Sequence, residues 1–311
     1  SGGNYNVAVG DEAGTAITTG DNNVFIGYTA GDAVTAASDN IGIGYNALGG
    51  ANTGAENVAI GSNALDANTS GVSNTAMGYN ALGANTTGSY NIGIGQSAGG
   101  AITTGQKNTL MGFGAGDATT TADNNTAVGY DALTANTTGT RNVAVGALAL
   151  DANTTASNNN AVGYSAMSAN TTGAGNQAFG DSALAANTTA ANNTAMGNFA
   201  MSANTTGFDN VAVGAIALDA NTTGNSNTAV GYGSLSADTL GDRAVAIGKN
   251  ALIAQNFTST TDNYNTAVGY GTGAAVTTGV NNTLIGGLAG DATTTGTGNT
   301  AVGNESLGAN T

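Results

Sequence analysis

The 311-residue chain contains no cysteine, histidine, proline or tryptophan, and charged residues make up only 7% of it. Without cysteine it forms no disulfide, so its redox compartment cannot be inferred from thiols. Without cysteine or histidine it has no thiolate nucleophile, no imidazole base and no conventional zinc site. These absences exclude most hydrolase and transferase mechanisms. We therefore expect a protein that is not an enzyme, with no catalytic, cofactor-binding or metal-ligating residues.

Basic residues are also scarce, and they are scattered along the chain: Lys107, Arg141, Arg243 and Lys249 stand against 19 acidic residues, for a net charge of −15. Because phosphate binding requires clustered Lys and Arg, we expect no nucleic acid partner. No apolar run approaches the roughly 20 residues of a membrane-spanning helix, and no signal peptide is visible, so we expect no membrane insertion. Because the chain begins with Ser1 in place of Met, we expect a processed form or an excerpt of a longer protein.

Glycine is abundant, with 51 residues, and one set of glycines keeps a strict phase. It begins at Gly10 and recurs at every seventeenth position to Gly248, steps by twenty-one to Gly269, and then returns to the seventeen-position spacing at Gly286 and Gly303. A disordered low-complexity segment has no reason to keep such a phase. Eighteen repeats with one four-residue insertion therefore cover the chain.

A clean copy of the repeat runs from Asn125 to Arg141, and we number its positions one to seventeen, with the phased glycine at position five. No stretch shows a 3.6-residue apolar stripe, and seventeen residues are too few for a helix–turn–helix unit. The pattern instead predicts an all-β, parallel β-solenoid (a β-roll or β-helix) of about 18 coils. Each coil is expected to hold two or three short strands that pair with those of the next coil, about 4.8 Å away. We expect a single solenoid domain over residues 1–311, with the insertion forming a loop near residues 255–263.

Three positions have clear structural interpretations. Position four is always large and apolar, which predicts a side chain in the core: Val9, Ile26, Ile43, Ile60, Val145 and Val302. Position five is always Gly, which predicts a turn with positive φ or a close backbone approach: Gly10, Gly27, Gly44 and Gly146. Position one is Asn in seventeen of eighteen copies, with Ala244 as the exception, which predicts a ladder of stacked, hydrogen-bonded amides: Asn57, Asn74, Asn91 and Asn142.

Substitutions at three other positions compensate one another in volume. Position nine, usually Leu or Met, is Gly in six coils, and in the same coils position twelve, usually Asn, becomes Ile17, Val34, Ile102, Thr119, Val276 or Thr293. Position three, usually Ala, is large only at Phe25, Leu110 and Leu284, in the second coil of each Gly-bearing pair. Close packing demands such an exchange, so positions three, nine and twelve are expected to line one interior space. The alternative is that the small residues of position three face outward and permit lateral association.

Several surface features have competing interpretations. Asp recurs at position ten but never in adjacent coils, as expected where like charges stack, and calcium in the Asp- and Asn-rich turns stays an open alternative. Tyr at position six either stabilises a corner or forms a ridge for sugar stacking, and we take Tyr28, Tyr45 and the insertion residue Phe257 as candidate contact residues. Thr at position thirteen is either a polar surface or an ice-binding array: Thr86, Thr103, Thr137, Thr171 and Thr205.

The segments Asn142-Val143-Ala144-Val145-Gly146 and Asn57-Val58-Ala59-Ile60-Gly61 resemble the head repeats of trimeric autotransporter adhesins. The longer repeat resembles those of phage tail-fibre-like and bacterial surface proteins. The resemblance implies left-handed coils and a homotrimer. Ser1 and Thr311 both fall at position thirteen without a polar cap, so head-to-tail stacking is the alternative mode of self-association.

We therefore expect a structural or adhesive subunit of an extracellular, cell-surface or virion-surface fibre or filament. Its partners are expected to be copies of itself and a surface glycan or receptor. The alternative is an ice-binding or glycan-binding module that uses the Thr or Tyr residues.

Overall fold

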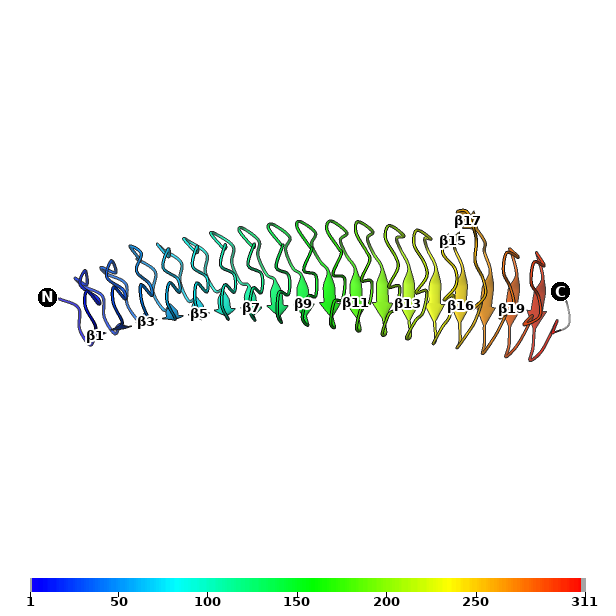
Figure 1. Cartoon of the computed structure of the whole chain (residues 1–311), viewed down its shortest axis with the longest axis horizontal. Coiled ribbons are helices and arrows are strands. Elements are labelled where there is room, and N and C mark those ends of the chain that lie inside the picture. Colours follow the sequence, from blue (N-terminus) through cyan, green and yellow to red (C-terminus); the bar gives the residue numbers. More distant parts are fainter. Residues whose placement is uncertain (1, 309–311) are drawn as a thin grey trace. The chain divides into compact units, whose positions relative to one another are not determined.

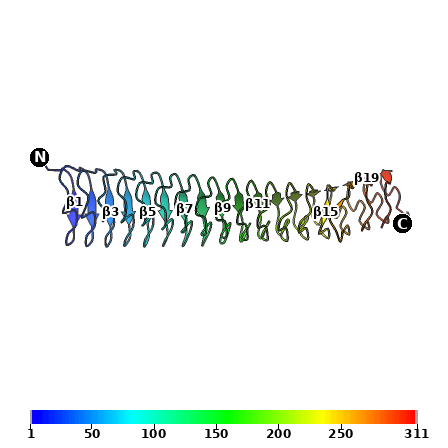
Figure 2. The same cartoon turned by 90° about the horizontal axis from the view of Figure 1, so that it is seen from above.

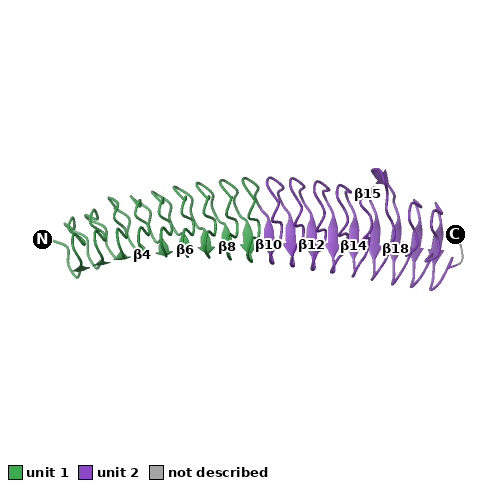
Figure 3. Cartoon of the chain, viewed as in Figure 1, with its two compact units in different colours: residues 1–157 green, residues 158–311 purple. Residues whose placement is uncertain are grey.

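The computed structural model describes residues 2–308, and in that range the backbone forms strands and turns but no helix. The fold is an all-β parallel β-solenoid in which each coil takes up one copy of the repeat, as the sequence predicts. Two compact units make up the chain, Ser1–Ser157 (unit 1) and Asn158–Thr311 (unit 2) (Figure 3). Ser1 and Thr311 lie outside the described residues, and so does the prediction of uncapped ends that depended on them.

Each coil of unit 1 contributes one three-residue strand, and successive strands pair in parallel, with Val7 opposite Val24 and Val24 opposite Ile41 (Figures 1 and 2). The expectation of two or three strands a coil is therefore wrong. The rest of the coil consists of turns, tied to the next coil by backbone bonds such as Leu65 N–H to Ala81 O, 3.1 Å. The strands are β1 (Val7–Val9), β2 (Val24–Ile26), β3 (Ile41–Ile43), β4 (Val58–Ile60), β5 (Thr75–Met77), β6 (Ile92–Ile94), β7 (Thr109–Met111), β8 (Thr126–Val128) and β9 (Val143–Val145).

Unit 2 repeats this arrangement and accommodates the insertion. Strand partners are one repeat apart in sequence except where Val245 pairs with Thr266. The longer coil also supplies β17 (Thr261–Asp262), which pairs with β15 (Gly241–Asp242) of the preceding coil in a second small sheet. The main strands are β10 (Asn160–Val162), β11 (Gln177–Phe179), β12 (Thr194–Met196), β13 (Val211–Val213), β14 (Thr228–Val230), β16 (Val245–Ile247), β18 (Thr266–Val268), β19 (Thr283–Ile285) and β20 (Thr300–Val302).

The glycine at position five ends each main strand, and two constraints exclude any other residue. Its φ is positive throughout, at 130° in Gly10, 136° in Gly27, 133° in Gly44 and 131° in Gly146, which confirms the predicted turn. Successive glycines also approach closely, because a Cβ on Gly27 would lie 2.4 Å from the carbonyl oxygen of Gly44. Both the backbone conformation and the contact with the next coil therefore require glycine.

The structure reverses the predicted orientation of the strand. Position three faces the interior, where Ala59 and its equivalents are buried in every coil but the first, and positions two and four face outward. Val9 and Val302 are 57% and 68% exposed and Ile26 is also exposed, while Ile43, Ile60 and Val145 are half-buried. The prediction that position four forms the core is wrong. Positions three and eight lie inside the coil and in most coils admit only Ala, so the larger side chains stay outside.

The interior space shared by positions three, nine and twelve is confirmed. A Cβ on Gly31 would lie 2.5 Å from the Phe25 ring, and Cβ atoms on Gly99 and Gly116 would each lie 2.7 Å from Leu110. Leu284 fills the same space beside Gly273 and Gly290 (Cβ distances 2.9 and 2.8 Å), and these large side chains are fully buried. Because position three faces inward, lateral association through its small residues is excluded.

Two ladders of buried Asn side chains join the coils. At position one, the predicted ladder is confirmed, because the backbone N–H groups of Asn74 and Asn91 donate to the preceding Asn Oδ1 at 3.0 and 2.9 Å. Asn57 and Asn142 donate in the same way at 3.0 and 2.9 Å. The ladder at position twelve was not predicted. Its Nδ2 groups donate to the preceding Asn Oδ1 at 2.8–3.1 Å in pairs that include Asn85–Asn68, Asn187–Asn170, Asn204–Asn187 and Asn221–Asn204.

Candidate functional site

The outward face, which we define as positions two and four of the main strands, is an apolar surface that runs along each unit. Position four is always Val, Ile, Met or Phe, and position two is Val, Ile or Thr apart from Asn160 and Gln177. Neither position carries a charged residue in any coil, although the chain has a net charge of −15. Met77 and Met111 are 40% and 38% exposed. A regular apolar face of this kind is typical of a protein–protein contact surface.

The Tyr residues of position six lie on the surface, at the turn that follows each main strand. Tyr28 and Tyr45 are about half-exposed, and their rings stack on each other at 5.8 Å. Phe113 and Tyr130 stack at 5.5 Å. Stacking between neighbouring coils covers one face of each ring, so these residues contribute to corner packing while staying accessible.

The Thr residues of position thirteen use their hydroxyls within the coil stack. Thr86 and Thr137 donate from Oγ1 to the carbonyl oxygens of Thr103 and Thr154, each at 3.0 Å, and Thr205 donates to Thr222 at the same distance. These hydroxyl hydrogens are not free to bind water. The arrangement therefore counts against position thirteen as an ice-binding array.

The Asp residues of position ten are half-buried in the turns. Desolvation raises the pKa of Asp66, Asp117, Asp151 and Asp219, and for Asp117 and Asp151 the charge of Asp131 raises it further. Backbone N–H groups lower the pKa of Asp66, Asp151 and Asp219 by less than burial raises it. Within residues 2–308, no group of three or more acidic side chains has the geometry to hold a metal ion.

These pKa values predict that the protein becomes more stable on acidification. A carboxyl whose pKa is raised in the folded state binds its proton more tightly there, so stability rises as pH falls through the raised pKa toward 3.8. Asp219→Ser, which matches Ser202 and Ser236 in the flanking coils, is expected to raise the urea midpoint at neutral pH and to leave it unchanged below pH 3.8. Asp209→Ser removes an exposed carboxylate and controls for net charge. If both variants raised the urea midpoint equally at neutral pH, the burial of the Asp219 carboxylate would not be the cause of the gain.

The insertion exposes Thr258, Ser259 and Thr260, as expected of a loop, while Gln255, Phe257 and Asn263 pack against the coils. Phe257 is only 5% exposed, so its prediction as a surface contact residue is wrong. It is held by Asp238, which accepts hydrogen bonds from the Phe257 N–H at 3.3 Å and from Gln255 Nε2 at 2.6 Å. Burial raises the pKa of Asp238, and these hydrogen bonds lower it by a smaller amount. Asp238 takes the place of Asn at position twelve and has no amide to donate, and Asn221 Oδ1 in the preceding coil is buried without a partner.

The insertion also repairs the position-one ladder. Ala244 donates its N–H to Asn227 Oδ1 at 2.9 Å but offers no side-chain oxygen to the next coil. Asn263 Oδ1 accepts the Asn265 N–H at 2.9 Å in its place, and Gln255 Oε1 accepts from Asn265 Nδ2 at 2.8 Å. The one coil that lacks the ladder Asn is therefore completed by residues that the insertion brings.

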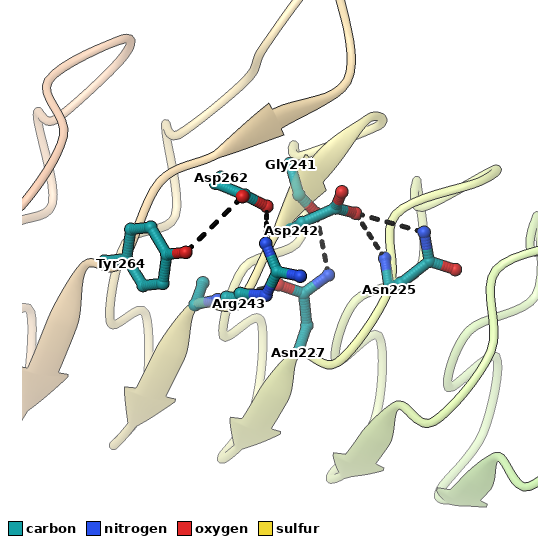
Figure 4. A network of polar contacts seen from close by, with 8 residues as sticks. Asn225, Asn227, Gly241, Asp242, Arg243, Asp262 and Tyr264 are labelled. Atoms are coloured by element: carbon teal, nitrogen blue, oxygen red, sulfur yellow. Dashed lines mark hydrogen bonds and ion pairs between the residues drawn. The ribbon is translucent and has the colours of Figure 1, made fainter.

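A polar network covers the outside of this region (Figure 4). Arg243 forms an ion pair with Asp262, and its guanidinium lies 5.7 Å from the centre of the Tyr264 ring. Asp242 Oδ1 accepts from the Asn225 N–H at 2.6 Å and from its Nδ2 at 3.3 Å. A shallow notch lies beside this network, lined by Phe208, Asn225, Ser226, Asp242 and Arg243.

Comparison with models of protein families and with curated proteins found no match to this chain. Among residues 2–308, no helix has the length and apolarity that crossing a bilayer requires.

Proposed function

We propose that this protein is a non-enzymatic structural protein, a subunit of an extracellular, cell-surface or virion-surface fibre with an adhesive role, and that it assembles with copies of itself through the outward face. The solenoid fold is compatible with this role. The single observation that carries the proposal is that the outward face is apolar, uncharged and exposed in a strongly acidic protein.

The size of the face can be compared with that of a standard interface. A standard interface buries about 800 Å² on each partner, which the nine coils of unit 1 reach if each contributes on the order of 90 Å². Each coil presents two side chains on this face, and the larger ones, such as Met77, are exposed by more than a third. With that contribution from each coil, the face of unit 1 alone reaches the area of a standard interface.

The spacing of the face favours a second copy over another partner. Its side chains recur once per strand along each unit, and packed sheets interdigitate the side chains of their facing surfaces. A copy of the same chain has the same spacing by construction, so its side chains stay in register over many coils. Charge also favours contact through this face, because two acidic copies repel each other least where the surfaces that meet carry no charge. The resemblance to trimeric adhesin heads implies three copies.

Charge placed on the outward face is expected to prevent association. We expect the wild-type protein to sediment as an oligomer and the double variant Met77→Glu/Met111→Glu to sediment as a monomer, because burying an unpaired carboxylate in an apolar interface is costly. Tyr79→Glu/Phe113→Glu adds the same charge to the same two coils at position six and should still associate. Analytical ultracentrifugation and electron microscopy measure the outcome. A monomeric wild-type protein, or dissociation by both double variants alike, would refute the proposed interface.

A further inference from the structure

The notch beside the polar network of unit 2 has the composition of a ligand site. It measures about 100 Å³ and is partly open to solvent, and its five lining residues occupy positions sixteen and seventeen of successive coils. Phe208 contributes a half-exposed aromatic ring at 48% exposure. Small-molecule sites combine such an apolar surface with a few convergent polar groups, and the small volume of this notch limits it to contact with part of one ring.

The packing of the coils does not require these residues. Position sixteen is small, polar or Val in every other coil, and Phe208 is its only aromatic residue. Burial does not explain a half-exposed Phe, and Arg243 and Tyr264, at position seventeen, also expose about half of their surface. In a repeat protein, an exposed departure from the repeat is free to serve recognition, because a rigid scaffold already positions it.

The polar groups of the notch are held in place by neighbouring residues and still have hydrogen-bonding capacity for a ligand. The ion pair with Asp262 and the contact with Tyr264 orient Arg243, and its remaining N–H groups stay available. Asp242 Oδ1 is held by Asn225, whereas Asp242 Oδ2 and the Ser226 hydroxyl accept or donate no hydrogen bond within the described residues. Groups fixed in place before binding lower the entropic cost of capturing a ligand.

From this geometry we infer that the notch binds a single neutral sugar ring, such as the terminal residue of a surface glycan. The apolar C–H face of a pyranose stacks on Phe208, and its hydroxyls, which both donate and accept, pair with Arg243, Asp242 and Ser226. Two carboxylates, Asp242 and Asp262, surround the one guanidinium, and the whole chain is acidic, so an anionic ligand is disfavoured. The inference builds on the adhesive part of the proposed function and does not depend on self-association.

Saturation-transfer NMR with the methyl glycosides of glucose, galactose, mannose and N-acetylglucosamine tests this inference. We expect transfer to at least one of the four, with binding about three- to tenfold weaker in Phe208→Ala, since an aromatic contact contributes that much. Ala191 occupies the same position in the preceding coil, so the substitution suits the fold. Arg243→Lys keeps the charge but loses the planar fork, and should also weaken binding.

Tyr232→Ala is the matched control, because it removes an exposed aromatic residue of position six. The alanine that it introduces is already found at this position one coil earlier, at Ala215. It should bind as the wild type does. No transfer to any of the four glycosides, or equal binding by Phe208→Ala and wild type, would overturn the notch as a sugar site. Loss in Tyr232→Ala alone would assign binding to the Tyr residues of position six and overturn it too. Phe208→Ala should sediment as the wild-type protein does. A loss of sugar binding in this variant is then distinguishable from a failure of the proposed assembly.

Discussion

Replacing Gly180 with alanine is expected to lower the free energy of unfolding by more than about 3 kcal/mol. Gly180 stands at position five with a φ of 141°, and a Cβ there would lie 2.4 Å from the carbonyl oxygen of Gly197. The backbone of the next coil cannot move away without breaking the parallel pairing of β11 with β12. Urea denaturation followed by circular dichroism measures the loss, and hydrogen exchange locates it along the coils.

Gly175→Asn provides the matched control in the preceding turn. Gly175 has a φ of 74°, and Asn158 and Asn192, at the same position of the flanking coils, have φ values of 64° and 61°. Only the flexible Asn192 side chain lies near the added Cβ, so this variant should differ from wild type by less than about 1 kcal/mol. Equal destabilisation by the two substitutions would contradict a special requirement for glycine at position five.

Asn193→Ala is expected to cost about 3–5 kcal/mol, because it breaks the position-one ladder in the middle of unit 2. Asn193 Nδ2 donates to Gly207 O at 2.9 Å, and its Oδ1 accepts the Asn210 N–H at 3.0 Å. Its own backbone N–H donates to Asn176 Oδ1 at 2.9 Å and survives the change. The variant therefore leaves the buried Asn210 N–H without a partner, removes one of the two hydrogen bonds that Gly207 O accepts, and leaves a cavity. Thermal and urea unfolding measure the effect.

The adjacent residue supplies the control for this second prediction. Asn192 is exposed, and Asn192→Gly gives position seventeen the residue that Gly175 already provides one coil earlier, so its effect on stability should be small. A cost for Asn193→Ala below about 1 kcal/mol would mean that the ladder contributes little to stability. Ala244 is not a precedent for tolerance, because Asn263 and Gln255 replace the missing side-chain contacts there and no insertion follows Asn193.

Much of the architecture followed from comparing the repeats with one another. The phase of the repeat predicted the coil, the parallel register and the stacking of equivalent residues, all of which the structure has. The invariant glycine and the near-invariant Asn of position one were interpreted correctly, because both are required by backbone contacts that recur in nearly all coils. The compensation in volume between Phe25 and Gly31 could also be predicted, since in a close-packed interior a larger side chain at one position requires a smaller one beside it.

The candidate sites were less accessible to sequence reasoning. Leu at position nine adopts a left-handed φ, 50° in Leu65 and 51° in Leu82, and only the glycines that replace it in other coils hinted at this conformation. Phe257 was taken for a surface residue because it lies in the insertion, but its contact with Asp238 depends on how the insertion folds back. The notch at Phe208 was missed because its residues come from successive coils and show no pattern in a single repeat. An aromatic residue that occurs once at an otherwise small or polar position was the available signal.

By itself the sequence determined that each copy of the repeat forms one coil of the solenoid. Only a stack of equal coils places equivalent residues next to one another and so explains why the same residue types recur at each position. It did not determine which side of the strand faces inward. An alternation such as Val58-Ala59-Ile60 places two large residues on one face and a small one on the other, and size alone favours the large ones as core. The tertiary structure decided the opposite, because Ala64, Leu65 and Asn68 are buried in the interior together with Ala59 and take up most of its space. That outcome leaves the apolar side chains of positions two and four exposed on the outward face.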